Sequence, residues 1–511
     1  MEPKIRGHVG PSLATTGVVV LLCLLASARA QDWMNHGGNP QRNGLSRMFG
    51  PHQPTLLWEG TLPSSFGQPV LICADKLVTY RDNFTTSIAV CHDLATGDTL
   101  WTMDFPGSGG RTMPVAFRDN TVYMVNLQNS APDTLYAFAA ADGALIWRCP
   151  YPVSVYLSES ATFAENGDLV LPLDGMRTAR INHLTGDTVW TTERVWPVSG
   201  SADVTISDSM WYCFGGALVG GSLRLYKFDL ATGRLRDSVF IEDTHPGGTA
   251  PYGNIMVGPD RVLYAHRCGD NVTAVEDWGD SLHIRWVYPL EDSTYSPFAQ
   301  LACGPDSSVY ALANGRIIRL DPETGAALDS SPYIKDSTAV FAAHLSVGSD
   351  GTVYATNGGY ADGALFAFTP NLSVIWVESI PNVSTSNPAL GGDCELAIAG
   401  SGTMLKVYRD PTGVGDLERA PVRRHLSATP NPFTEATTIR LSPLALRHSP
   451  SAVSIYDAQG RLVRVLCPPQ SLTPSPYPLP WDGRNQSGVV APAGVYVIRT
   501  GSESVRAVKT R

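Results

Sequence analysis

Several patterns that would assign a chemistry are missing from this chain of 511 residues. There is no Cys-x-x-Cys and no Cys-x-x-Cys-His, because the run Cys91-His92 has isoleucine at position 88. Attached haem and ordinary zinc sites are therefore not expected. A Gly-x-Ser-x-Gly nucleophile elbow, a Gly-rich phosphate loop and a His-x-x-x-His pair are also missing.

Histidines and acidic pairs give no better case for catalysis. The histidines stand singly in different parts of the chain, and a lone histidine is more often structural. The acidic pair Glu291-Asp292 could serve a glycosidase, yet any acidic surface supplies such pairs. We name no catalytic, cofactor-binding or metal-binding residue. The histidines considered are His183, His245, His266, His283 and His344.

Positive charge is scarce in most of the chain. Lys and Arg number 37 against 47 Asp and Glu, a formal charge of −10. Residues 426–511 hold nine basic and four acidic residues, and the leader described next adds +2, which leaves about −17 for residues 31–409. An acidic body argues against nucleic acid as a partner, because phosphate binding needs basic surface. Acidity is equally an ordinary solubility feature.

Long apolar runs are confined to the first thirty residues. Lys4 and Arg6 precede an apolar run from Gly17 to Leu25, and Ala28-Arg-Ala30 supplies a small-x-small cleavage site. The run is too short to span a bilayer comfortably, so residues 1–30 are predicted to be a secretory signal peptide. No later run approaches a transmembrane helix. We expect an exported, soluble protein.

Cysteines are few and dispersed. Eight follow the leader, about one per repeat and mostly within apolar stretches. Exported proteins can form disulfides, but eight cysteines allow 105 complete pairings and nothing in the sequence selects one. The simplest expectation is that most are small buried hydrophobic residues.

One phrase recurs along residues 31–409: a short strand, an Asp/Thr/Gly turn, then Trp or a replacement. A clear copy reads Asp93-Leu-Ala-Thr-Gly97-Asp-Thr-Leu-Trp101, with Trp four residues after the turn glycine. The Trp slots are Trp58, Trp101, Trp147, Trp190, Asp237, Trp286, Asp329 and Trp376, at steps of 43, 46, 43, 47, 49, 43 and 47 residues. A period of about 40–45 residues with several strands is typical of a β-propeller.

The count predicts how the ring closes. Eight Trp slots enclose seven sets of three strands, and an eighth set follows at about Ala389–Tyr408. We therefore predict that the strand Thr55–Thr61 completes the last blade, which removes open sheet edges. The predicted fold class is all-β, an eight-bladed propeller with seven blades as the alternative. Because Asp237 and Asp329 replace Trp, blades four and six should dock differently.

The repeats resemble those of the pyrroloquinoline-quinone propeller superfamily, whose blades carry Ala-x-Asp-x-x-Thr-Gly-x-x-x-Trp. The opening run Asp32-Trp33 to Ser46 resembles the segment that introduces such propellers in exported bacterial proteins. The superfamily includes quinone-dependent dehydrogenases and non-enzymatic scaffolds such as an outer-membrane assembly lipoprotein. Its dehydrogenases stack the quinone on a disulfide between adjacent cysteines and hold Ca²⁺ with Glu, Asn and Asp. This chain has no Cys-Cys pair.

A different pattern follows residue 409. Residues 410–425 are predicted to be a linker, and residues 426–511 carry short alternating strands that suggest an immunoglobulin-like sandwich. Tyr456 and Tyr496 are expected in its core, and Trp481-Asp-Gly483 indicates a strand end entering a tight turn. The order of motifs resembles the C-terminal sorting domain of type IX secretion substrates and an immunoglobulin-like domain of hook-capping proteins. The alternative is a fixed accessory domain for adhesion or packing.

These observations favour a secreted or cell-surface, non-catalytic propeller that acts as a binding or scaffold module. The resemblance implies Sec export, then the type IX machinery as a partner, at the surface of a Gram-negative-type bacterium. An unidentified protein or glycan would bind the propeller loops, such as Gly215–Ser222, Thr244–Gly253 and Gly358–Gly363. No cofactor is expected. The alternatives are a dehydrogenase that uses pyrroloquinoline quinone and Ca²⁺, and a glycan-binding or glycan-cleaving protein.

Overall fold

The structure is a computed structural model in which the chain divides into two compact units, Met1–Arg419 and Ala420–Arg511. Every regular element among the described residues is a β-strand, and no helix there is long and apolar enough to cross a membrane. The predicted signal peptide and nearly all of the predicted linker lie outside the described residues. Those residues are 33–60, 70–82, 86–106, 112–126, 134–150, 161–173, 177–192, 204–215, 223–242, 253–267, 270–290, 301–334, 345–359, 362–381, 383, 387–400, 405–410, 426–441, 453–457, 461–466, 477–500 and 503–510.

Eight four-stranded antiparallel sheets make up the described part of the first unit. Sheet 1 contains β2 (Leu71–Cys73), β3 (Lys76–Asp82), β4 (Thr86–Asp93) and β5 (Thr99–Pro106). Sheet 2 contains β6 (Thr112–Arg118), β7 (Thr121–Asn126), β8 (Thr134–Ala139) and β9 (Leu145–Pro150). Sheet 3 contains β10 (Thr162–Phe163), β11 (Leu169–Leu173), β12 (Arg177–Ile181) and β13 (Thr188–Thr191). Sheet 4 contains β14 (Val204–Ser207), β15 (Met210–Gly215), β16 (Leu223–Asp229) and β17 (Leu235–Ile241).

The second half of the unit repeats this order. Sheet 5 contains β18 (Gly253–Val257), β19 (Leu263–Arg267), β20 (Asn271–Asp277) and β21 (Leu282–Pro289). Sheet 6 contains β22 (Ala302–Cys303), β23 (Val309–Ala313), β24 (Arg316–Leu320) and β25 (Ala327–Ser330). Sheet 7 contains β26 (Leu345–Val347), β27 (Val353–Thr356), β28 (Ala364–Phe368) and β29 (Val374–Ser379). Sheet 8 contains β30 (Ala389–Leu390), β31 (Leu396–Ala399), β32 (Leu405–Arg409) and β1 (Thr55–Gly60).

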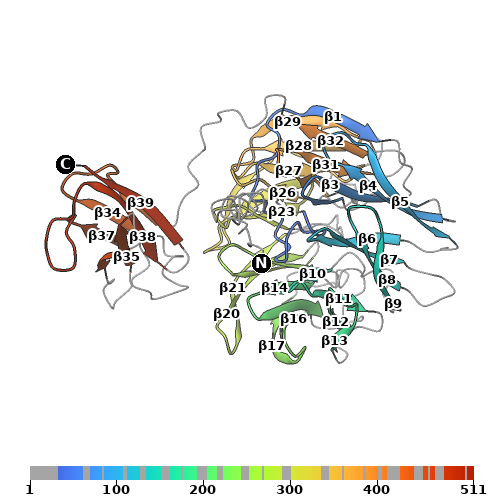
Figure 1. Cartoon of the computed structure of the whole chain (residues 1–511), viewed down its shortest axis with the longest axis horizontal. Coiled ribbons are helices and arrows are strands. Elements are labelled where there is room, and N and C mark those ends of the chain that lie inside the picture. Colours follow the sequence, from blue (N-terminus) through green and yellow to red (C-terminus); the bar gives the residue numbers. More distant parts are fainter. Residues whose placement is uncertain are drawn as a thin grey trace, which may run out of the picture. The chain divides into compact units, whose positions relative to one another are not determined.

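Sheet 8 joins the two ends of the repeat region. The strand β1, from the start of the region, pairs antiparallel with β32 at its end, as the Trp58 slot predicts. In Figure 1 the blue β1 accordingly lies beside the orange strands of the last repeats. Asp410 accepts hydrogen bonds from the backbone N–H groups of His52 (3.1 Å) and Gln53 (2.7 Å). The turn of sheet 8 is therefore formed by two separate chain segments. In sheet 1, the equivalent turn is formed by Asp93 and the residues that follow it in one segment.

Tryptophans of the outer strands connect six of the eight sheets to the next. Trp101 in β5 donates from Nε1 to the carbonyl of Ala140 in sheet 2 at 2.8 Å, and its ring lies on Gly143 of the same turn. A methyl group added at Gly143 would come within 3.0 Å of that ring, and Gly143 has φ +72°. The same hydrogen bond runs from Trp58, Trp147, Trp190, Trp286 and Trp376 to the carbonyls of Leu94, His183, Leu230, Pro322 and Pro51.

A β-bulge in each outer strand aims these side chains. In sheet 1, Cys91 pairs with Trp101 but His92 pairs with Thr99, so Leu100 is an extra residue. Such a bulge bends the strand and redirects the side chain that follows. The ring is therefore turned toward the neighbouring sheet. The extra residues in the eight sheets are Leu57, Leu100, Ile146, Val189, Arg236, Arg285, Leu328 and Ile375.

The two slots without Trp dock differently, which confirms the prediction for repeats four and six. The Asp237 carboxylate accepts the backbone N–H of Leu282 in sheet 5 at 2.7 Å. Between sheets 6 and 7, Tyr310 donates its hydroxyl to the Pro370 carbonyl at 2.8 Å, the position that a Trp Nε1 takes elsewhere. Asp329 instead pairs with Arg319 of its own sheet at 3.0 Å.

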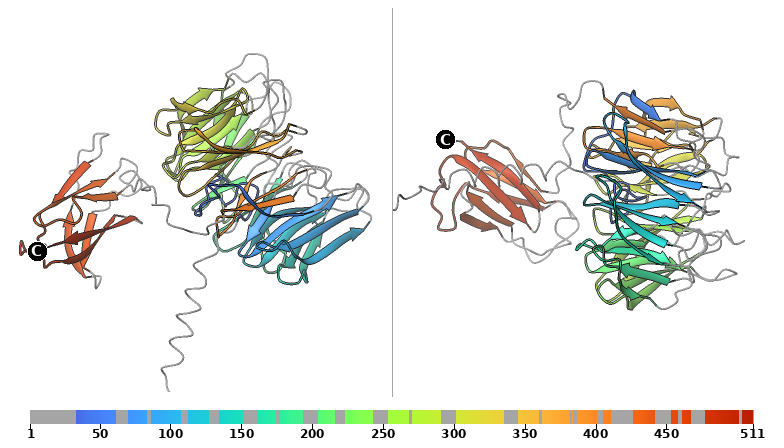
Figure 2. Two further views of the ribbon diagram at one scale, coloured as in Figure 1. Left: turned by 90° about the horizontal axis from the view of Figure 1, so that it is seen from above. Right: turned by 45° about the vertical axis from the view of Figure 1, so that its right-hand side comes forward.

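The second unit contains two antiparallel sheets that share one apolar core. One sheet has the order β33 (Leu426–Thr429), β34 (Thr437–Leu441), β37 (Tyr477–Trp481). The other has the order β36 (Leu462–Leu466), β35 (Val453–Asp457), β38 (Gly494–Thr500), β39 (Glu503–Lys509). Figure 2 shows these sheets from two further directions. Trp481 and Ile498 are fully buried between them.

Two local predictions for this unit are confirmed and one is wrong. Trp481 ends β37, and Gly483 in the following turn has φ +67°. Tyr496 is buried at 3% exposure. Tyr456, however, is only partly buried and lies outside the core, with the Arg499 guanidinium 5.9 Å from its ring centroid. It alternates along β35 with the buried Ile455, so its side chain points to the opposite face of the sheet.

Candidate functional site

Residues 33–50, which we call the strap, contact the inner strands of seven sheets and the residue two positions before the eighth. In each of sheets 1, 2, 4, 5, 6 and 7, one backbone N–H group of the inner strand donates to a strap carbonyl. The donors, in that order, are Ile72, Phe117, Ile206, Val257, Cys303 and Val347. Sheet 3 contributes the Thr162 hydroxyl, which donates to the Pro40 carbonyl at 3.0 Å. Beside β30 in sheet 8, the Asn387 amide donates to the His36 carbonyl at 3.0 Å. Because one short segment is hydrogen-bonded to seven inner strands and to the residue two positions before the eighth, it occupies the axis that they surround.

Polar side chains of the strap are buried at this axis. The Asn43 amide donates to the Val257 carbonyl at 2.8 Å. Gly37 has no room for a side chain, since an added methyl would lie 2.5 Å from the Arg42 Cα. The strap therefore folds back on itself. Its buried polar residues are Asn35, His36, Arg42, Asn43 and Ser46, all at most 5% exposed.

The strap marks one end of the first unit. Val257, Cys303 and Val347 are the last residues of their inner strands, so the strap lies where these strands enter the turn to the second strand. We call this the turn end. Because the strands are antiparallel, the connections from second to third strands and from one sheet to the next leave from the opposite end, the loop end.

The three loops predicted to bind a ligand connect strands at the loop end. Gly215–Ser222 and Thr244–Gly253 lie almost entirely outside the described residues. In Gly358–Gly363, the described glycines are buried, and the carbonyls of Gly359 and Gly363 accept the backbone N–H groups of Val383 and Ile380. Their role in binding stays a prediction.

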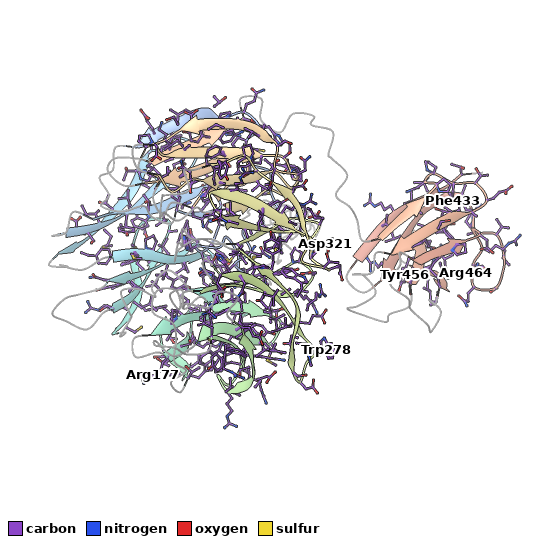
Figure 3. All side chains as sticks on the ribbon, turned by 180° about the vertical axis from the view of Figure 1, so that it is seen from behind. Arg177, Trp278, Asp321, Phe433, Tyr456 and Arg464 are labelled. Carbon is purple, nitrogen blue, oxygen red and sulfur yellow. The ribbon has the colours of Figure 1, made fainter. Side chains whose placement is uncertain are left out.

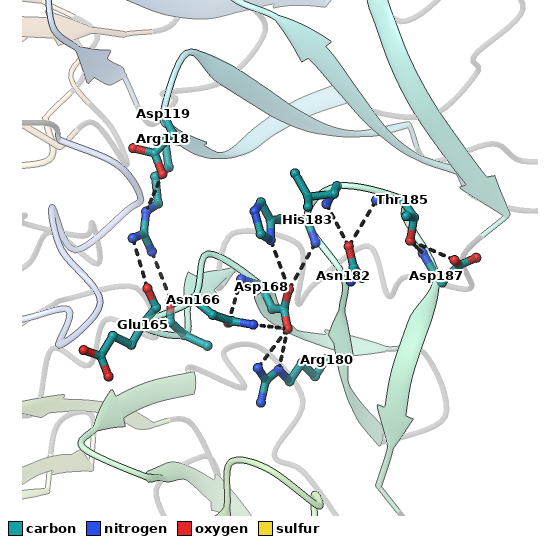
Figure 4. Close-up of polar contacts among 12 residues, drawn as sticks. Arg118, Asp119, Glu165, Asn166, Asp168, Arg180, Asn182, His183, Thr185 and Asp187 are labelled. Atoms are coloured by element: carbon teal, nitrogen blue, oxygen red, sulfur yellow. Dashed lines mark hydrogen bonds and ion pairs between the residues drawn. The ribbon is translucent and has the colours of Figure 1, made fainter.

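Asp168, at the turn end of sheet 3, is the centre of a polar network (Figure 4). Its carboxylate accepts from Asn166 Nδ2 at 2.9 Å, contacts His183 Nδ1 at 3.1 Å and pairs with Arg180 at 2.8 Å. Burial opposes ionisation, but the hydrogen bonds from Asn166, His183 and Arg180 outweigh it, and the pKa of Asp168 lies below its ordinary value. Arg180 also donates to the Leu230 carbonyl of sheet 4 at 3.0 Å. Arg180, paired with Asp168, thus links sheet 3 to sheet 4.

Replacing Asp168 with asparagine should lower the free energy of unfolding by about 1–3 kcal/mol at pH 7. Because the folded pKa is depressed, the contribution of the carboxylate is complete above the ordinary value of 3.8 and is lost as pH falls below it. The difference between wild type and variant should therefore shrink with acid in denaturant melts between pH 7 and pH 2. Asp119→Asn, at a residue whose side chain is 79% exposed, is the control and should change little. A gap that widens with acid would contradict this account.

The junction between sheets 4 and 5 contains a second buried network. Lys227, whose side chain is 2% exposed, pairs with Asp277 at 2.6 Å and donates to the Gly279 carbonyl at 2.7 Å. Tyr212 donates its hydroxyl to the same carboxylate at 2.6 Å. Burial opposes ionisation of Asp277, but the hydrogen bonds from Lys227 and Tyr212 hold its pKa below the ordinary value. These side chains take the place of the missing Trp.

Two buried carboxyl groups have raised pKa values, the property that a general acid requires. Burial raises the pKa of Asp260 in sheet 5 and of Glu395 in sheet 8. Asp260 accepts the Tyr264 hydroxyl at 2.7 Å, and Glu395 accepts the Asp393 N–H at 2.7 Å. They belong to different sheets, and each stabilises its own turn.

The three candidate histidines that the structure describes are not brought together. His183 belongs to the Asp168 network, His266 is buried in β19, and His283 lies in β21, where it contacts the Ser281 hydroxyl at 2.9 Å. His245, His344 and the pair Glu291-Asp292 lie outside the described residues. Within the part of the chain that the structure describes, no group of three His, Cys, Asp or Glu side chains could hold a metal ion.

The cysteines in described positions behave as small apolar residues. Cys91, Cys149, Cys213, Cys303 and Cys394 are free, and all of these but Cys149 are buried, as is Cys73. Burial raises the pKa of the Cys91 and Cys213 thiols to about 12, so neither forms a reactive thiolate near neutral pH. Cys268 and Cys467 fall outside the described residues.

Comparison with known proteins places the first unit in a recognisable fold. Residues 85–331 match the family described as outer membrane protein assembly factor BamB. BamB from Moraxella catarrhalis is 15% identical with a TM-score of 0.52, over 70% of this chain and 100% of that one. The quinohemoprotein alcohol dehydrogenase ADHIIG from Pseudomonas putida HK5 is 14% identical with a TM-score of 0.55, over 74% of this chain and 80% of that one.

A further quinohemoprotein alcohol dehydrogenase, from Comamonas testosteroni, is 12% identical with a TM-score of 0.54, over 83% of this chain and 86% of that one. No curated protein matches the sequence. At these identities the likeness concerns the fold alone. The first unit therefore has the propeller-type fold shared by BamB and the quinone-dependent dehydrogenases.

Proposed function

We propose that the first unit is an eight-bladed β-propeller that serves as a non-catalytic binding or scaffold module. The observation that carries this proposal is the strap, which is hydrogen-bonded to seven sheets and to Asn387 just before the eighth, and so fills the axis at the turn end. The charged residues at the sheet junctions support it as well. Asp168, Arg180, Lys227 and Asp277 are already engaged in holding one sheet to the next.

Such a ring is a rigid support for the connections at the loop end. Function in proteins of this kind is usually carried by loops that a rigid scaffold positions. We infer that an unidentified protein or glycan binds there. BamB, whose name describes an assembly factor, shares this fold and sets a non-enzymatic precedent for it.

The alternative is a dehydrogenase that uses pyrroloquinoline quinone and Ca²⁺. The likeness in fold to two quinohemoprotein alcohol dehydrogenases favours this alternative. The residues do not fit that cofactor well. The sequence has no adjacent cysteines, and the buried carboxyl groups Asp260 and Glu395 lie in different sheets with local partners. We derive no step through the quinone. Glycan binding or cleavage is the second alternative.

One set of assays separates these functions. The mature chain is mixed with pyrroloquinoline quinone and Ca²⁺, and dye-linked oxidation of alcohols and sugars is followed. We expect no turnover above the protein-free control. Oxidation that requires both the protein and the quinone would overturn the scaffold proposal. Saturable carbohydrate binding without oxidation would identify the ligand as a glycan, and release of reducing ends would establish a glycosidase.

We further propose that residues 426–511 form an immunoglobulin-like sorting domain for type IX secretion, after Sec export through the predicted signal peptide. Two sheets around one core, with Trp481 and Tyr496 buried, are consistent with such a module. Its net positive charge, against about −17 for residues 31–409, sets it apart from the propeller.

Deletion of residues 426–511 should retain the protein inside the outer membrane. The expected result is loss of most extracellular protein, at least tenfold, with accumulation in the periplasm, measured by immunoblotting of culture supernatant and periplasmic extract. The thermal melt of the retained protein shows whether the first unit is folded. Unchanged export of a folded, truncated chain would reject the sorting role and favour a fixed accessory domain.

A further inference from the structure

A tryptophan at the turn end of sheet 5 is exposed although it is held in one orientation. Trp278 lies in the hairpin between β20 and β21 and is 65% exposed, at the outer margin of the first unit in Figure 3. Its Nε1 donates to Glu276 Oε2 at 2.9 Å, and one face of its ring stacks on His283 with centroids 3.9 Å apart. We call residues 276–283 the Trp278 hairpin.

The position of this hairpin explains how the ring can be free of the neighbouring sheet. The preceding outer strand has Asp237 in place of Trp, so no tryptophan lies on the turn glycine as elsewhere. A methyl group at Gly279 would meet nothing within 4 Å, whereas one at Gly325 in sheet 6 would come within 2.6 Å of Trp286. Burial therefore does not account for an aromatic residue at position 278.

Anchoring the indole reduces the entropy that a ligand must remove on binding. Its orientation is fixed by the carboxylate at one edge and by the imidazole on one face, which leaves the other face open. Preorganised, exposed Trp side chains of this kind are common anchors in protein interfaces.

Charge around the hairpin selects the ligand. Glu276 and Asp277 pair with Arg285 and Lys227 at 2.6 Å each, while Asp280 accepts a hydrogen bond from the Ser281 hydroxyl at 3.0 Å. Asp280, two residues after Trp278, thus adds negative charge to the hairpin. Donation of the indole N–H to a carboxylate also enriches the ring in electrons, which strengthens its attraction for a cation.

The chain shows the same interaction within itself. The Arg316 guanidinium lies 3.7 Å from the ring centroid of Tyr333, which is itself 61% exposed. In this protein, an exposed aromatic ring therefore binds a guanidinium group of the same chain. Trp278 offers such a ring beside carboxylates, on a body of about −17 formal charge that would attract basic partners.

We propose that the Trp278 hairpin binds a cationic side chain, Lys or Arg, of a basic segment in a partner protein. The open indole face receives the cation and Asp280 supplies the neighbouring negative charge. This site is at the turn end, so it is a second contact surface, separate from the loop end to which the proposed function assigns binding.

The test uses the mature full-length chain and a fluorescein-labelled hexa-arginine peptide, with affinity measured by fluorescence anisotropy at low salt. Trp278→Ala should weaken binding by about two- to fivefold, the range of an exposed cation–π contact. Trp278→Phe should weaken it less, and Asp280→Asn should lower affinity at low salt but not at high salt. Tyr333→Ala is the matched control and should leave affinity unchanged, because that ring already holds Arg316.

Equal affinity of wild type and Trp278→Ala, with unchanged thermal melts, would overturn the proposal. So would binding of a neutral oligosaccharide such as cellohexaose that Trp278→Ala abolishes while peptide affinity is unaffected, since the ring would then be a sugar platform. Either result would leave the proposed binding role of the loop end standing.

Discussion

Replacing Trp101 with alanine should lower the free energy of unfolding of the first unit by about 3–5 kcal/mol. The side chain is 8% exposed, its Nε1 donates to the Ala140 carbonyl at 2.8 Å, and its ring covers Gly143. The variant loses buried apolar area and leaves that carbonyl with only the weak Cys91 thiol donor at 3.8 Å. The measurement is chemical denaturation followed by near-ultraviolet circular dichroism. A loss below about 1 kcal/mol would contradict the role of Trp as the link between sheets.

A double-mutant cycle tests which residues form the link. Gly143→Ala alone should destabilise, because φ is +72° and the new methyl would meet the Trp101 ring at 3.0 Å. Part of that cost should vanish when Trp101 is already alanine, which gives a coupling of about 0.5–3 kcal/mol. Trp147→Ala is the control, since Trp147 follows Gly143 by four residues but contacts Gly186 of sheet 3. That pair should be additive to within about 0.5 kcal/mol.

Removal of residues 33–48 should have the largest effect of any change considered. The deletion breaks one hydrogen bond or more to each of seven sheets and one to Asn387 just before the eighth, and at about 0.5–1.5 kcal/mol each the loss is about 4–12 kcal/mol. It also removes the buried Trp33. Since most domains are stable by only about 5–15 kcal/mol, the truncated ring should be protease-sensitive and largely unfolded at 37 °C. Limited proteolysis and thermal melts measure this.

Rescue in trans distinguishes a lost strap from a general folding defect. A synthetic peptide of residues 31–50 should restore protease resistance to the truncated chain in a saturable manner. The same peptide with Gly37→Val should fail, because a Cβ at that position lies 2.5 Å from the Arg42 backbone. Full stability of the truncated chain without peptide would show that the strap does not hold the ring.

Much of the fold follows from local patterns in the sequence. Turn glycines such as Gly97 and Gly186 have φ +78° and +77°, and both follow Thr in the recurring Asp/Asn-x-x-Thr-Gly turn, where only glycine reaches this conformation without strain. The slot count also predicts that the Trp58 strand completes sheet 8. These features depend on backbone conformation and on alternation between neighbours, which short stretches of sequence specify.

The candidate sites could be predicted far less well. Nothing in the opening run Trp33 to Ser46 indicates that it reaches seven inner strands and Asn387, because those partners are spread from Ile72 to Asn387. The exposure of Trp278 likewise depends on Asp237, some forty residues earlier in the chain. Both properties result from contacts between residues that are distant in sequence.

The repeat, the turn chemistry, the order of strands and the two exceptional slots follow from local sequence, since each is specified within one repeat. Which tryptophan contacts which glycine depends on packing between sheets. The spacing suggests that Gly143 contacts Trp147, which follows it by four residues. The ring that lies on Gly143 is instead that of Trp101 in the preceding repeat. The reason is the bulge before each slot, which turns the side chain toward the next sheet. A single extra residue of this kind has no signature in composition or spacing, and its effect exists only once the neighbouring sheet is in place.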